Sequence, residues 1–140
     1  MLQIKPLTRE FSVSPQILLD DLSTIAKLGF KSIINNRPDG EDNEQPNHQI
    51  LQRKCSELGL KYQYLPVIPG QITKQNSQDM SDYMSQLEKP ILAFCRTGTR
   101  SCLLWLGTAN DSNALKDGME RANTQGYTFN LNQIPSLMNR

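Results

Sequence analysis

Short apolar runs that alternate with helical patterns are the feature that most restricts how this chain can fold. Strand-like runs are expected at 11–13, 30–36, 62–67 and 91–94. Apolar residues repeat at helical spacing between and after these runs, around 15–28, 48–58, 77–87, 101–106 and 113–126. This alternation predicts an α/β fold with a mostly parallel sheet flanked by helices.

Two serines are expected to begin helices. Ser14 is an N-cap residue type followed by Pro15, which suits the first helical position, and Gly29 suits the end of the same helix. Ser77 is the corresponding expected N-cap of the helix that carries Met80. The polar stretch 37–49, RPDGEDNEQPNHQ, has the length of a loop.

Length and charge limit the class of protein. The 140 residues predict one domain spanning 1–140, and the net charge of +1, with no long run of one sign, disfavours nucleic-acid and membrane-surface partners. The apolar runs are too short to span a bilayer. The first residues carry no apolar leader and the three cysteines form no CxxC pair, so the protein is expected in the reducing cytoplasm.

The segment 94–101, FCRTGTRS, carries the strongest chemical signal. Ligands of open α/β sheets bind beyond the carboxyl ends of the strands, where Cys95 follows an apolar strand and precedes a helix. A helix N-terminus and a nearby guanidinium stabilise a thiolate, so Cys95 is expected to be a nucleophile and Arg100 to bind the oxyanion. The residues expected to form the anion-binding loop between them are Arg96, Thr97, Gly98 and Thr99.

Other residue types in the chain favour structural roles. A cysteine that closes a buried strand is often only a core residue, but the complete loop favours catalysis for Cys95. Cys55 and Cys102 lie in apolar patterns and are expected to be packing residues, as is Trp105. No GxGxxG or GxxxxGK motif occurs and His48 is the only histidine, so no metal ion or cofactor is expected.

The loop resembles the active-site loop of cysteine-dependent phosphatases and of rhodanese-type sulfurtransferases. Four residues separate Cys95 from Arg100, one fewer than in the phosphatases and as in many rhodaneses. From Phe11 to Tyr127, the chain resembles the bacterial phosphatase-like family related to the N-terminal domain of beta-lactamase-hydrolase-like proteins. The segments that carry the resemblance are SVSPQ, GFKSIINNRPDGE, LGLKYQYLPVIPGQIT and PILAFCRTGTRS.

The resemblance implies a dual-specificity-phosphatase-like fold and a set of site residues. Cys95 corresponds to the nucleophile, Arg100 to the oxyanion-binding arginine, and Ser101 to the hydroxyl residue that eases departure of the thiolate. Phosphatases of this fold carry an aspartate general acid on an earlier loop, and the matching stretch here, LPVIPGQIT, contains no acid. Asp39 and Glu41 are weak substitutes, since a solvated acidic turn shaped by Pro38 and Gly40 explains them better than a catalytic role does.

Three functions therefore remain open. The first is hydrolysis of phosphate monoesters through a cysteinyl-phosphate on Cys95. The second is sulfur transfer through a persulfide on Cys95, which takes a sulfur donor and an acceptor thiol and needs no general acid. The third is a non-catalytic anion-binding or redox-sensing module. In each case the expected partner is a small anionic or phosphorylated molecule, or a thiol, rather than a macromolecular polyanion.

Overall fold

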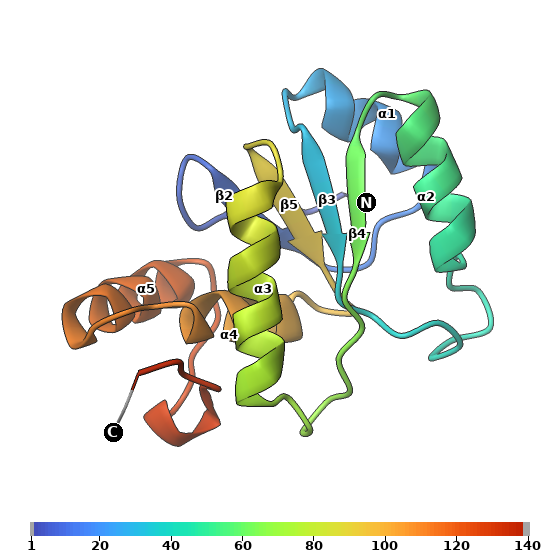
Figure 1. Cartoon of the computed structure of the whole chain (residues 1–140). Helices are drawn as coiled ribbons and strands as arrows, with labels where there is room; N and C mark the ends of the chain where they lie inside the picture. Colours follow the sequence, from blue (N-terminus) through green and yellow to red (C-terminus); the bar gives the residue numbers. More distant parts are fainter. Residues whose placement is uncertain (1, 139–140) are drawn as a thin grey trace.

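A five-stranded sheet with the strand order β1-β2-β5-β3-β4 forms the centre of the computed structural model, which describes residues 2–138 (Figure 1). The edge strand β1 (Lys5–Pro6) pairs antiparallel with β2 (Phe11–Ser14). The remaining strands β5 (Ile91–Phe94), β3 (Ser32–Asn35) and β4 (Lys61–Tyr64) run parallel to β2. The expected mostly parallel α/β fold is confirmed, and the short edge strand β1 is an addition that was not predicted.

Helices cover both faces of the sheet (Figure 1). One face packs against α1 (Leu19–Lys27) and α2 (His48–Glu57), and the other against α3 (Lys74–Gln86), α4 (Thr99–Gly107) and α5 (Ser112–Thr124). A single 3₁₀ turn, η1 (Leu131–Gln133), follows α5. No helix within residues 2–138 has both the length and the apolar character that a membrane crossing requires.

The central strands divide their side chains between two hydrophobic cores. Side chains alternate along a strand, so adjacent residues of β5 and β3 face opposite sides. Leu92 and Phe94 pack with Ile33 on the α1 and α2 side, whereas Ala93 and Ile34 pack on the side of α3, α4 and α5. Because these strands are buried on both faces, their sequences are continuous apolar runs rather than alternating ones.

Two of the expected helix starts are wrong. Ser14 ends β2, and α1 begins only at Leu19 after an extended segment. The N-cap of α3 is Thr73, whose side chain accepts from the backbone of Asn76. Ser77 instead lies buried inside that helix and donates to the carbonyl of Pro135. Local capping signals are thus overridden here by tertiary contacts.

The strand register brings the segments that follow four strands to one edge of the sheet. Phe94 lies level with Ser14 on one side and with Asn35 on the other, and Asn35 lies level with Tyr64. The residue that follows each of these strands therefore leaves the sheet at the same edge. Cys95 occupies the middle position, directly after the central strand.

Candidate active site

Cys95 lies where the central strand ends and is buried. The backbone N–H of Gly98 donates to its Sγ at 3.1 Å. Helix α4 begins at Thr99, so the positive end of the helix dipole lies next to the sulfur. A sulfur in this position is suited to act as a thiolate nucleophile.

Gly98 gives the loop its shape. Its φ of +90° is a left-handed conformation that favours glycine. The hydroxyl of Tyr127 donates to the carbonyl of Thr97 at 2.9 Å, and a Cβ on Gly98 would lie 2.2 Å from that hydroxyl oxygen. Glycine is thus required both for the backbone turn and for the close approach of Tyr127.

Arg100 is buried and its guanidinium is held in place by several acceptors. Nη1 and Nη2 donate to the two carboxylate oxygens of Glu41 at 2.8 and 2.9 Å, and Nη1 also donates to the carbonyl of Val67 at 3.0 Å. Burial opposes the charged form of Arg100, but its hydrogen bonds with Glu41 and the neighbouring Cys95 sulfur outweigh this and raise its pKa. Arg100 is therefore a fixed cation beside Cys95.

Glu41 joins this arginine to a second one. The Nε of Arg37 donates to a Glu41 oxygen at 2.8 Å, and Nη1 of Arg37 donates to the side chain of Gln16 at 2.9 Å. The hydrogen bond from Arg100 lowers the pKa of Glu41 against the opposing effect of burial, with a smaller contribution from Arg37. Two guanidiniums share one carboxylate, so one positive charge remains uncompensated within this group.

Ser101 is tied to the loop after β3. Its buried hydroxyl donates to Oδ1 of Asn36 at 2.8 Å, and Nδ2 of Asn36 donates to the carbonyl of Leu65 at 2.9 Å. The resemblance implied that this hydroxyl helps the thiolate of Cys95 to depart. In the structure its proton is directed to Asn36.

The remaining residues of the expected anion-binding loop lie towards solvent. Arg96 and Thr97 are exposed, and the hydroxyls of Thr97 and Thr99 lie 2.8 Å apart. The backbone carbonyl of Arg96 accepts from the N–H of Gln16 at 3.2 Å, which links this loop to the segment after β2.

The two carboxylates expected as weak general-acid candidates have different environments. Glu41 reaches Arg100, as described above, whereas Oδ2 of Asp39 contacts the imidazole Nδ1 of His48. The His48 ring stacks on Tyr64 with 4.0 Å between ring centroids, and the Tyr64 hydroxyl accepts from the backbone N–H of Asp39 at 2.9 Å. The structure thus brings Glu41, but not Asp39, into contact with Arg100.

The other sequence-based assignments concern packing residues. Burial raises the pKa of both Cys55 and Cys102 to about 12, so these thiols stay protonated in the core. Trp105 packs against Phe11 with nearly parallel rings 6.2 Å apart. Within residues 2–138, no cluster of histidine, cysteine and acidic side chains could hold a metal ion.

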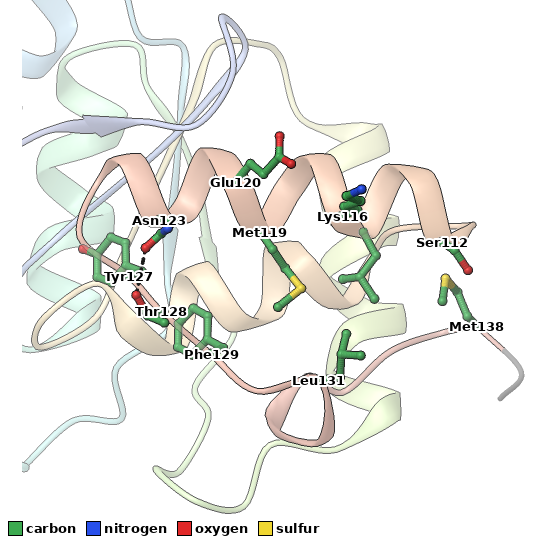
Figure 2. Close-up of a pocket in the computed structure, with 11 residues that line it drawn as sticks. Ser112, Lys116, Met119, Glu120, Asn123, Tyr127, Thr128, Phe129, Leu131 and Met138 are labelled. Carbon is green, nitrogen blue, oxygen red and sulfur yellow. Dashed lines mark hydrogen bonds between the residues drawn. The ribbon is translucent and has the colours of Figure 1, made fainter.

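A cavity of about 730 Å³ lies apart from Cys95, between α5 and the residues that follow it. Figure 2 shows Met119 and Leu131 pointing towards each other across this space. Tyr127 lines one end of the cavity, and its hydroxyl reaches the carbonyl of Thr97. The same ring therefore contributes to the cavity wall and braces the loop after Cys95.

Sequence reasoning missed several residues of this site. Asn36 and Arg37 directly follow a buried parallel strand, and that position alone was a signal that could have identified them. Gln16 follows β2 in a similar way. Tyr127 gives no comparable signal, since only the folding of the chain after α5 brings it to Gly98.

The fold is that of protein-tyrosine-phosphatase-like domains. A PP-IP phosphatase from S. cerevisiae, crystallised as its core catalytic domain with citrate, shares this fold with a TM-score of 0.66 and 16% identity over 97% of this chain and 85% of that one. A crystal structure of a candidate phosphatase from Neisseria meningitidis Z2491 matches with a TM-score of 0.77 and 32% identity over 89% of each chain.

The chain belongs to the family of phosphatase-like domains of beta-lactamase hydrolase-like proteins, whose model matches residues 3–114. The beta-lactamase hydrolase-like protein of Xylella fastidiosa (strain Temecula1) is 30% identical over 140 residues, which cover 99% of this chain. The chain spans about a third of that relative, 32% of its length. These findings confirm the family expected from the sequence and support a phosphatase-like hydrolase.

Proposed function

We propose that the protein is a cysteine-dependent phosphatase that hydrolyses phosphate monoesters through a cysteinyl-phosphate on Cys95. The observation that carries the proposal is the position of the Cys95 sulfur, which accepts the Gly98 N–H at the N-terminus of α4 beside the fixed guanidinium of Arg100. The positive charge shared by Arg37, Glu41 and Arg100 suits a small phosphorylated substrate.

The reaction would proceed in two displacements. In the first, the Cys95 thiolate attacks phosphorus, an S–P bond forms, and the P–O bond to the leaving group breaks with its electron pair going to that oxygen. In the second, water attacks phosphorus, the S–P bond breaks, and inorganic phosphate and the thiolate are released. The backbone amides of residues 96–100 and the Arg100 guanidinium would stabilise the phosphoryl oxygens in both steps.

The test is release of phosphate from an aryl phosphate by the wild type and by Cys95→Ser. Cys55→Ser is the matched control, because Cys55 is an equally buried thiol in the core between the sheet and α1 and α2. We expect Cys95→Ser to lose the activity and Cys55→Ser to keep it. Equal rates in wild type and Cys95→Ser would refute the proposal.

Sulfur transfer is the second candidate function, and the four-residue spacing between Cys95 and Arg100 favours it. The thiolate would attack the outer sulfur of a donor such as thiosulfate, releasing sulfite and leaving a persulfide. Cyanide would then take that sulfur as thiocyanate and regenerate the thiolate. Thiocyanate formation that depends on Cys95, without phosphate release, would favour this function.

A further inference from the structure

The acidic side chains near Cys95 restrict the substrates that the proposed phosphatase can use. Residues 1, 139 and 140 carry no acidic side chain, so all 14 aspartates and glutamates lie within the described residues 2–138. The loop 65–73 after β4 approaches Arg100 through the carbonyl of Val67 and has the sequence LPVIPGQIT, without an acid. The segment 15–18 after β2 also has none.

Glu41 is the acidic residue in contact with the arginine of the site, and it is poorly suited to donate a proton. Its two oxygens accept three hydrogen bonds from Arg37 and Arg100 at 2.8, 2.8 and 2.9 Å. These hydrogen bonds lower its pKa, so the carboxylate stays ionised at neutral pH. Protonation would also remove the charge that holds the Arg100 guanidinium in place.

The other acidic side chains of this loop and the hydroxyl of nearby Tyr64 are the remaining candidates for a proton donor. Oδ1 of Asp39 accepts from the backbone N–H of His48, and Oδ2 contacts Nδ1 of the imidazole. Tyr64 lies under that imidazole, and burial raises the pKa of its hydroxyl, which makes it a weaker acid. Asp42 and Glu44 are exposed, and Oδ1 of Asp42 accepts from the backbone of Glu44 at 3.2 Å.

We infer that the substrate is a phosphoryl compound whose leaving group departs as a stable anion, such as an aryl phosphate, an acyl phosphate or a phosphoanhydride, rather than an alkyl phosphate. This inference rests on the proposed function. When the S–P bond to Cys95 forms, the electron pair of the breaking P–O bond goes to the leaving oxygen. Arg100 and the loop amides would stabilise the phosphoryl oxygens, whereas Glu41, the carboxylate in contact with Arg100, is held by two guanidiniums and is poorly placed to protonate the leaving oxygen.

The expected difference in rate between substrates follows from the rate enhancement that general acid catalysis normally supplies. General acid catalysis contributes about 10²- to 10⁴-fold for a leaving group that needs a proton. A phenolate, a carboxylate or a phosphate departs without one, whereas an alkoxide does not. The rate of the first displacement should therefore fall as the pKa of the leaving group rises.

The experiment measures kcat/KM for para-substituted phenyl phosphates of similar shape and increasing phenol pKa, together with an alkyl phosphate such as 2-phenylethyl phosphate. We expect log kcat/KM to decrease steadily along the series, and the alkyl phosphate to react at least about 10²-fold more slowly than the most acidic phenol ester. Cys95→Ser provides the blank. A flat dependence would overturn the inference while leaving the cysteine mechanism intact.

The variants Asp39→Asn and Asp42→Asn test whether either carboxylate donates a proton to the leaving group. If either carboxylate donated the proton, its loss would slow the esters of the least acidic phenols selectively and steepen the dependence. The inference predicts the same slope in both variants as in the wild type, and a steeper slope in either would overturn it. If no ester in the series is hydrolysed in a manner that depends on Cys95, the proposed function itself fails.

Discussion

Replacing Gly98 by alanine tests whether Tyr127 fixes the conformation of the loop after Cys95. The left-handed backbone at φ +90° costs an alanine about 1–2 kcal/mol. The new Cβ would lie 2.2 Å from the Tyr127 hydroxyl oxygen, so this hydroxyl must move and lose its hydrogen bond to Thr97, worth about 0.5–1.5 kcal/mol. The two effects together lower the free energy of unfolding of Gly98→Ala by about 1.5–3.5 kcal/mol.

A double-mutant cycle with Tyr127→Phe separates the two effects. Tyr127→Phe alone removes the hydrogen bond and should cost about 0.5–1.5 kcal/mol. In the double variant this bond is already lost and the closest contact of the Cβ is gone, so the double variant should be about as stable as Gly98→Ala. Urea unfolding should therefore give a coupling energy of about 0.5–1.5 kcal/mol.

Gly126→Ala is the matched control for backbone strain. Gly126 has nearly the same φ, +93°, but no atom lies within 4 Å of its added Cβ. It should lose only about 1–2 kcal/mol and show no coupling to Tyr127→Phe. Strictly additive losses in the Gly98 and Tyr127 variants would refute the role of Tyr127 as a brace of the loop.

Three further predictions follow from the contacts of the site. Glu41→Gln should lower the free energy of unfolding by about 1.5–3 kcal/mol at neutral pH. The pKa of Glu41 is lowered in the folded state. The stability difference between wild type and Glu41→Gln is therefore present above the ordinary pKa of 4.5 and is lost as the pH falls through the folded-state pKa. A stability difference that persists in strong acid would contradict this prediction. Cys55 and Cys102 should resist alkylation by iodoacetamide at neutral pH in the folded protein, because burial raises the pKa of each thiol to about 12. Peptide mass mapping that finds either cysteine alkylated would disprove this prediction. Ser101→Ala should cost about 1–3 kcal/mol by leaving the buried Oδ1 of Asn36 without this donor, and an unchanged Tm would argue against that contact.

The sheet and the position of Cys95 could be predicted because both depend on local patterns. Short strand-like runs, each followed by a polar segment and a helical repeat, indicate parallel strands with their loops at one edge. Cys95 and Arg100 are five positions apart across one such strand-to-helix junction, so their proximity follows from the sequence alone. The expected packing roles of Cys55 and Cys102 follow from the same apolar patterns and agree with their burial.

The contacts that complete the site could not be predicted in this way. Glu41 and Arg100 are 59 positions apart, and the segment around Glu41 has the composition of a solvated turn. Arg37 begins that polar segment, yet it is buried because Glu41 and Gln16 satisfy its guanidinium. Ser14 and Ser77 are not helix N-caps for a related reason. Ser14 pairs with Phe94 as the last residue of β2, and the hydroxyl of Ser77 donates to a carbonyl far along the chain.

The most direct test of the proposed mechanism is detection of the covalent intermediate. Wild-type protein is mixed rapidly with an aryl phosphate, quenched in acid, and analysed by peptide mass spectrometry. We predict one phosphoryl group on Cys95 in the wild type and in Cys55→Ser, and none in Cys95→Ser. Continued phosphate release by the wild type with no phosphoryl group on Cys95 would contradict the mechanism.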